Sequence, residues 1–110
     1  MRTELEERTR RFAVRPVRAV GAFPKSAEVQ IIGKQLLRSA TSVGANYREA
    51  NCAESRNDFV HRFGVADETI YWLEICRDTK LGTEKQIPNL LDEAGQLLAI
   101  LVTIGRKAKK

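Results

Sequence analysis

The sequence predicts an all-α domain, an antiparallel up-down-up-down four-helix bundle, and three observations lead to this fold class. Apolar side chains recur at steps of three and four residues along most of the chain, which is the period of an α-helix. No stretch alternates with period two for long enough to predict a strand. Charged residues make up 30% of the chain and aromatic residues only 6%, as in water-facing helices. The length of 110 residues predicts one domain over residues 1–110, and short connections favour antiparallel neighbours.

The first helix is expected over residues 3–21. Thr3 and Glu6 have the spacing of a capping box, which marks a helix start. Pro16 falls inside the helical pattern and predicts a kink, with the helix in one piece or in two, since an interior proline costs roughly 3 kcal/mol. Four of the five arginines of this segment recur at steps of three and four residues and so line one flank: Arg8, Arg11, Arg15 and Arg18.

The second helix is expected over residues 26–52, with Ser26 as its cap. Polar side chains fall on its apolar stripe or on the edge of that stripe: Gln35, Ser39, Ser42 and Asn46. Buried polar groups must be hydrogen-bonded, so we interpret these four as a core polar network that fixes the helix register. A ligand site is the alternative. Gly33 and Gly44 indicate a close approach of backbones, because each costs about 1 kcal/mol in a free helix.

The third helix is expected over residues 56–80, with Gly82 ending it. A second apolar row lies about 120° from the predicted core face of this helix: Val65, Trp72 and Cys76. One bundle does not easily bury both rows, so we expect this row, with Gly33 and Gly44, to form an oligomer interface. The alternative is that Trp72 closes the edge of the core.

The fourth helix is expected over residues 88–106, where Pro88 suits a first helical turn, and a basic tail follows over 106–110. The net charge of +5 is uneven, since residues 1–20 together with the tail carry +7 and the middle of the chain carries −2. In a four-helix bundle the fourth helix ends near the start of the first, so we expect the two basic segments to merge into one patch. The predicted nucleic-acid-binding residues are Arg8, Arg11, Arg15, Arg18, Arg106, Lys107, Lys109 and Lys110.

No enzyme is expected from these residues. His61 is the single histidine, and it falls on the polar side of its helix rather than beside a nucleophile. Cys52 and Cys76 cannot complete a zinc site with one histidine, so we expect reduced thiols, no metal and no cofactor. The longest apolar run is far shorter than the roughly 20 residues that a membrane span needs. We therefore expect no membrane association and a cytoplasmic location.

The run QLLRSATSVGANYREA over residues 35–50 carries a family resemblance, with Glu54-Ser55-Arg56, Phe59 and the later Tyr71-Trp72. It resembles the four-helix bundle proteins encoded in intervening sequences of bacterial 23S ribosomal RNA genes, sometimes labelled S23. The resemblance covers roughly residues 5–106. It implies a cytosolic bundle that assembles into a ring of five, similar to the accessory protein of diversity-generating retroelements, which binds nucleic acid and a reverse transcriptase. No enzymatic activity is implied.

Two functions are consistent with these features. The first is a non-enzymatic oligomeric scaffold with a basic surface that binds RNA or DNA, with itself and a reverse transcriptase or other protein as further partners. The second is a protein-interaction adaptor whose basic surface meets an acidic partner protein. Salt-sensitive binding that ignores nucleotide sequence would favour the first function.

Overall fold

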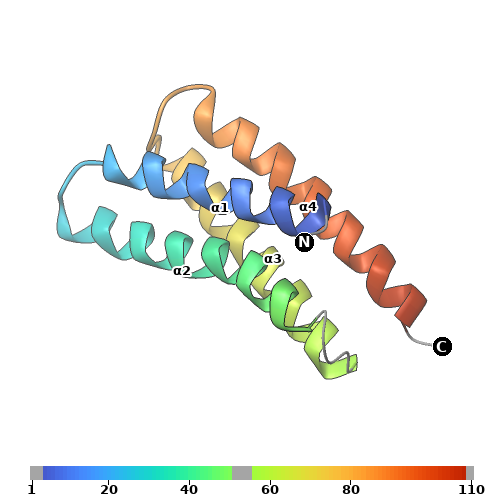
Figure 1. The fold of residues 1–110 in the computed structure, drawn as a ribbon. Coiled ribbons are helices and arrows are strands. Elements are labelled where there is room, and N and C mark those ends of the chain that lie inside the picture. Colours follow the sequence, from blue (N-terminus) through green and yellow to red (C-terminus); the bar gives the residue numbers. More distant parts are fainter. Residues whose placement is uncertain (1–3, 51–55, 109–110) are drawn as a thin grey trace.

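The computed structural model describes residues 4–50 and 56–108, with side chains described for residues 4–45 and 64–103. Four helices follow one another along the chain: α1 (Glu4–Gly21), α2 (Ala27–Ala50), α3 (Arg56–Asp78) and α4 (Gln86–Ala108). Each helix runs antiparallel to the one before it (Figure 1). The predicted all-α four-helix bundle is confirmed.

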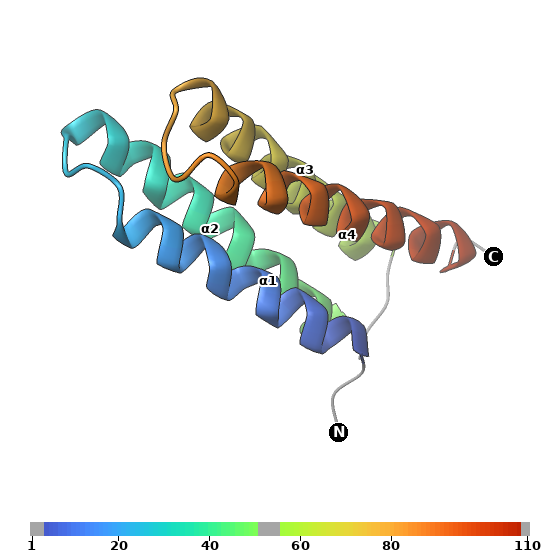
Figure 2. The same cartoon turned by 90° about the horizontal axis from the view of Figure 1, so that it is seen from above.

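The helices pack in chain order, and α1 also packs against α4, which closes the bundle. Within the described residues, α1 does not contact α3 and α2 does not contact α4, so each of these pairs occupies diagonal corners (Figure 2). As a result, α4 has α1 on one side and α3 on the other. This arrangement decides which surface side chains can act together.

The core is built from large apolar side chains of all four helices. Phe12 from α1, Leu36 from α2, Leu73 from α3 and Leu97 from α4 are each at most 2% exposed. Burying a side chain of this size contributes about 1.5–3 kcal/mol to folding. These positions all belong to the helical periodicity of the sequence, which agrees with the burial of one face of each helix.

Pro16 lies inside α1, which is nevertheless assigned as one helix from Glu4 to Gly21. Its lack of an N–H group removes one hydrogen bond of the helix interior. The ring is fully buried in the bundle, so the apolar area that it removes from water offsets part of that cost. The sequence allowed the first helix to be continuous or divided at Pro16, and the structure shows that it is continuous.

The helix α3 ends two residues earlier than expected, and Gly82 is not the residue that stops it. Lys80 adopts the left-handed conformation, with φ at 59°. The Leu81 N–H donates to the Cys76 carbonyl at 2.9 Å, and the Lys80 N–H donates to the Arg77 carbonyl at 3.1 Å. These two bonds form a Schellman motif, which satisfies the last carbonyl groups of the helix.

The helix α4 begins at Gln86, two residues before the predicted start, because of a capping box. The Gln86 N–H donates to Thr83 Oγ1 at 3.2 Å, and the Thr83 N–H donates to Gln86 Oε1 at 3.3 Å. This reciprocal pair satisfies two donors that the helix itself leaves open. The predicted cap of α2 is present, since the Val29 N–H donates to Ser26 Oγ at 3.3 Å.

The helices α1 and α2 approach closely at two glycines of α2. A Cβ atom at Gly33 would lie 2.9 Å from Val20 Cγ1, and a Cβ atom at Gly44 would lie 3.3 Å from Thr9 Oγ1. Both glycines are buried within the chain. The small residues therefore allow close packing inside one bundle, which corrects the expectation that Gly33 and Gly44 lie at an oligomer interface.

The second apolar row of α3 is also covered by the chain itself. Cys76 is 0% exposed inside the main core, and Val65 and Trp72 are half-buried and pack against core side chains. One bundle covers this row because α2 and α4 both pack against α3. The expected interface role is therefore wrong for Cys76, while Trp72 closes the edge of the core. Burial raises the pKa of the Cys76 thiol to about 11, as for an unreactive structural cysteine.

Candidate nucleic-acid interface

Arg8, the first of the predicted phosphate-binding residues on α1, is engaged within the chain. Its Nε donates to Glu93 Oε2 and its Nη2 donates to Glu93 Oε1, both at 2.8 Å. Nη2 also donates to Gln96 Oε1 at 2.9 Å. The side chains of Arg8 and Glu93 are only 30% and 20% exposed. Arg8 therefore joins α1 to α4, which corrects the prediction that it binds phosphate.

This ion pair also determines the protonation of Glu93. The hydrogen bond from Arg8 holds the pKa of Glu93 below its ordinary value of 4.5, while partial burial acts in the opposite direction. The positive charges of Arg8, Arg15 and Arg11 lower this pKa further. Because Arg11 and Arg15 act on a residue of α4, they lie on the flank of α1 that borders α4.

We expect Glu93→Gln to lower the free energy of unfolding by about 1–2 kcal/mol at pH 7, because it leaves Arg8 without its charged partner. A folded-state pKa below the unfolded value means that the pair stabilises the protein above about pH 4.5 and loses this effect as the pH falls through the folded pKa. The difference between the two proteins should therefore shrink towards pH 3. Urea unfolding at pH 7 and pH 3 measures it.

The control for this prediction is Glu68→Gln, which breaks the exposed pair between Glu68 and Arg38. Exposed ion pairs contribute about 0–1 kcal/mol, so this variant should unfold almost as the parent does. Equal losses in Glu93→Gln and Glu68→Gln would contradict a special role for the α1–α4 ion pair.

The other three predicted phosphate-binding arginines of α1 form an exposed row along the helix, and we call Arg11, Arg15 and Arg18 the arginine row. None of the three has a side-chain ion pair or hydrogen bond to the residues that the structure describes. The row extends over seven helical steps, from Arg11 to Arg18, or roughly 10 Å at the helical rise of about 1.5 Å per residue. These guanidinium groups keep all of their donors for a partner.

Arg106, near the end of α4, lies far from Arg15 of α1 along the bundle. The contact of Arg8 with Glu93 fixes how α1 and α4 are aligned, and α4 continues well past the start of α1 (Figure 2). Arg106 lies 13 residues beyond Glu93, while Arg15 lies seven residues from Arg8 in the opposite direction, a separation of roughly 30 Å. Arg106 and Arg15 therefore do not adjoin, while the expectation of one merged patch depends on the tail side chains and stays a prediction. The side chains of Arg106, Lys107, Lys109 and Lys110 lie outside the described residues.

The polar residues predicted as a core network form local bonds instead. Ser39 is buried and donates to the Leu36 carbonyl at 3.1 Å, so its hydroxyl is satisfied by its own helix. Ser42 donates to the Arg38 carbonyl at 2.6 Å, and Gln35 Oε1 accepts from Nη2 of Arg38 at 3.1 Å. Within the described residues, no hydrogen bond joins these polar side chains to one another. The fourth member of the set, Asn46, has a side chain outside that part of the chain.

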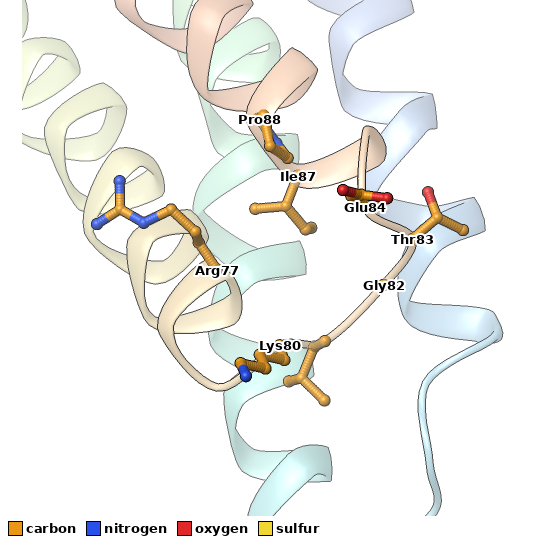
Figure 3. A pocket seen from close by; sticks show the side chains of 8 residues that line it. Arg77, Lys80, Gly82, Thr83, Glu84, Ile87 and Pro88 are labelled. Carbon is orange, nitrogen blue, oxygen red and sulfur yellow. The ribbon is translucent and has the colours of Figure 1, made fainter.

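A small cavity of about 300 Å³ lies at the turn between α3 and α4 (Figure 3). Arg77, Lys80, Thr83, Glu84 and Ile87 line it together with backbone of the turn. The Arg77 side chain is engaged by Asp78, with Nε 3.0 Å from Oδ1. The cavity is open to solvent, and its lining combines both signs of charge without a histidine or cysteine.

Two further predictions concern metals and membranes. Among the side chains that the structure describes, no group of three His, Cys, Asp or Glu residues comes together as metal ligands. None of the described helices is long and apolar enough to cross a membrane.

The geometry defines a small antiparallel four-helix bundle with an arginine row on its first helix. The chain belongs to the family of 23S rRNA-intervening sequence proteins, whose sequence profile matches residues 2–103. A crystal structure from Bacteroides thetaiotaomicron, of a protein with unknown function from the S23 ribosomal protein family, is 34% identical. The match covers 91% of this chain and 96% of that chain, with a TM-score of 0.76. No curated protein matches the sequence.

Proposed function

We propose that this protein is a non-enzymatic, cytoplasmic scaffold that binds RNA or DNA through the arginine row and assembles with copies of itself. The observation that carries the proposal is the exposure of Arg11, Arg15 and Arg18 without partners among the described residues. Arginine suits this role because its planar guanidinium group binds phosphate oxygens through two parallel hydrogen bonds. The C-terminal basic residues 106–110 add a second set of phosphate contacts. The proposal also includes assembly into a ring of five and a reverse transcriptase as partner, because the family resemblance implies both.

The dimensions of the row fit a nucleic-acid backbone. One strand of a duplex presents a phosphate about every 3.4 Å along the axis, so a row of roughly 10 Å faces about three phosphates. Contacts to phosphate carry no sequence information. The proposal therefore predicts binding that depends strongly on salt and little on nucleotide sequence.

The test is a titration of a fluorescent 20-base-pair duplex, in RNA and DNA forms, at several salt concentrations. We expect Arg11→Glu with Arg15→Glu to weaken binding about 10- to 100-fold. The slope of log affinity against log salt on DNA should fall by about 2, because each lost phosphate contact removes about 0.9. Helix content by circular dichroism should not change, since both side chains are exposed.

A matched control is Lys25→Glu with Lys34→Glu, which changes the net charge equally at exposed positions outside the arginine row. A smaller loss in this control than in the double arginine variant would support a local site. Equal affinity of the parent and the double arginine variant would exclude the arginine row as a phosphate-binding surface.

The alternative function, a protein adaptor with an acidic partner, is favoured by two apolar side chains beside the row. Val14 and Val17 are 41% and 50% exposed on α1. Exposed apolar groups add to a protein contact but little to a phosphate contact. If the Val14→Ser with Val17→Ser variant bound the duplex as tightly as the parent, these two residues would have no part in phosphate binding.

A further inference from the structure

An exposed acidic row lies on α3 and is longer than the arginine row, at roughly 16 Å against roughly 10 Å. Asp67, Glu74 and Asp78 are exposed and lie at helical spacing along one line of α3, with Tyr71 between them at 53% exposure. Asp78 forms an ion pair with Arg77, and the charge of Glu74 also acts on Arg77 and raises its pKa, so Arg77 offsets part of the negative charge at this end of α3. We call Asp67, Glu74 and Asp78 the acidic row.

Both rows border the same helix, α4. The arginine row does so because Arg11 and Arg15 act on Glu93. On α3, Glu68 bonds to Arg38 of α2 at 2.6 Å, so that flank of α3 faces α2. Helical geometry at about 100° per residue places Asp67 and Glu74 on the opposite flank, which faces α4. Since α1 and α3 do not touch, the two rows cannot neutralise each other inside one chain.

We infer that the arginine row of one copy docks on the acidic row of a second copy, so that these two surfaces form the subunit contact. This inference rests on the self-association that the proposed function includes. Two like rows would repel each other across an interface, so only the pairing of unlike rows is electrostatically favourable. Each copy has one row of each sign. The contact can therefore repeat head to tail from copy to copy, or form twice between the two copies of a dimer.

The apolar groups on the two surfaces support a protein partner. Val14 lies beside the arginine row and Tyr71 lies within the acidic row, and both are exposed in the single chain. Aromatic side chains and arginines are enriched in protein interfaces, where their burial contributes most of the affinity. A second copy would cover both groups, whereas a nucleic-acid backbone would leave them in water.

The contact also regulates the proposed nucleic-acid site, because both use the guanidinium groups of Arg11, Arg15 and Arg18. A second copy and a phosphate backbone therefore compete for the row. Arg106 and Lys107, roughly 30 Å from Arg15 along the bundle, lie outside the contact. An assembled protein thus keeps its C-terminal basic residues for nucleic acid.

The test uses two variants that carry opposite charge reversals. Arg11→Glu with Arg15→Glu makes the α1 surface acidic, and Asp67→Lys with Glu74→Lys makes the α3 surface basic. Light scattering at low salt should give the parent protein a mass of at least twice the 12.4 kDa of one chain, and each variant alone a mass near one chain. An equimolar mixture of the two variants should recover the parent mass, because every contact in it again pairs unlike rows.

The inference would be overturned if the parent protein had the mass of a single chain at low salt. It would also be overturned if the Asp67→Lys with Glu74→Lys variant kept the parent mass, or if the mixture of the two variants stayed at the mass of a single chain. Duplex binding separates this inference from the proposed function. The variant with a reversed acidic row should bind duplex RNA at least as tightly as the parent, since its arginine row is open. Weaker duplex binding by the Asp67→Lys with Glu74→Lys variant would exclude competition between a second copy and nucleic acid for the arginine row. Unchanged duplex affinity of the Arg11→Glu with Arg15→Glu variant would instead contradict only the proposal that the arginine row binds phosphate.

Discussion

Replacing Leu36 by alanine is expected to lower the free energy of unfolding by about 2–5 kcal/mol. Leu36 is 0% exposed at the middle of α2 and belongs to the main core, to which all four helices contribute. Alanine would remove apolar area and leave a cavity that the surrounding helices can close only in part. Because small domains are stable by only about 5–15 kcal/mol, this one change would remove a large share of the stability.

The control is Ile31→Ala, on the same helix. Ile31 is 62% exposed, so the same kind of truncation should change the unfolding free energy by no more than about 0.5 kcal/mol. Urea unfolding followed by circular dichroism measures both variants. If Ile31→Ala cost as much as Leu36→Ala, the assignment of the buried face of α2 would be wrong.

The buried face of α2 was predictable because helical periodicity depends on residues close together in the sequence. The alignment of α1 with α4 was not predictable in this way. Arg8 and Glu93 are 85 residues apart, and several other carboxylates could have paired with Arg8. The prediction of one merged basic patch assumed that α4 ends beside the start of α1, whereas α4 continues past it (Figure 2).

The ends of α3 and α4 illustrate a different limit. The spacing of Thr83 and Gln86 is that of a capping box, and the same rule that was applied to Thr3 and Glu6 would have placed the start of α4 correctly. By contrast, the left-handed Lys80 was not visible, because Gly82 is the residue that propensity favours for that conformation. Packing of the buried Leu81 fixes the helix end at Lys80 instead.

The candidate site was predictable in part. The spacing of Arg8, Arg11, Arg15 and Arg18 placed them on one flank of a helix, but spacing alone does not separate a residue paired within the chain from an exposed one. Arg8 is distinguished from the exposed arginines only by its ion pair with Glu93 of α4. Likewise, the spacing of Trp72 and Cys76 predicted a surface row. In the structure both side chains pack against the core, because neighbouring helices lie over them.

Gly44→Leu is expected to lower the free energy of unfolding by about 1–3 kcal/mol, because it forces extra volume between α1 and α2. A Cβ atom at Gly44 would already lie 3.3 Å from Oγ1 and 3.6 Å from the backbone carbon of Thr9. Thr9 is 0% exposed, and its hydroxyl donates to the Glu6 carbonyl at 3.0 Å, so it has little freedom to move away. The remaining carbon atoms of leucine would push the two helices apart.

The same substitution at Gly95 should have the opposite sign. Gly95 is exposed on α4, and a Cβ atom there would meet nothing within 4 Å, so leucine should stabilise the helix by roughly 1 kcal/mol through its higher helix propensity. Urea unfolding measures the stability of both variants, and light scattering measures their mass. A Gly44→Leu protein of unchanged stability but reduced mass would place Gly44 between subunits, as the sequence alone suggested. Loss of stability at unchanged mass would place it between α1 and α2 of one chain, because packing strain inside a subunit acts on folding before it acts on assembly.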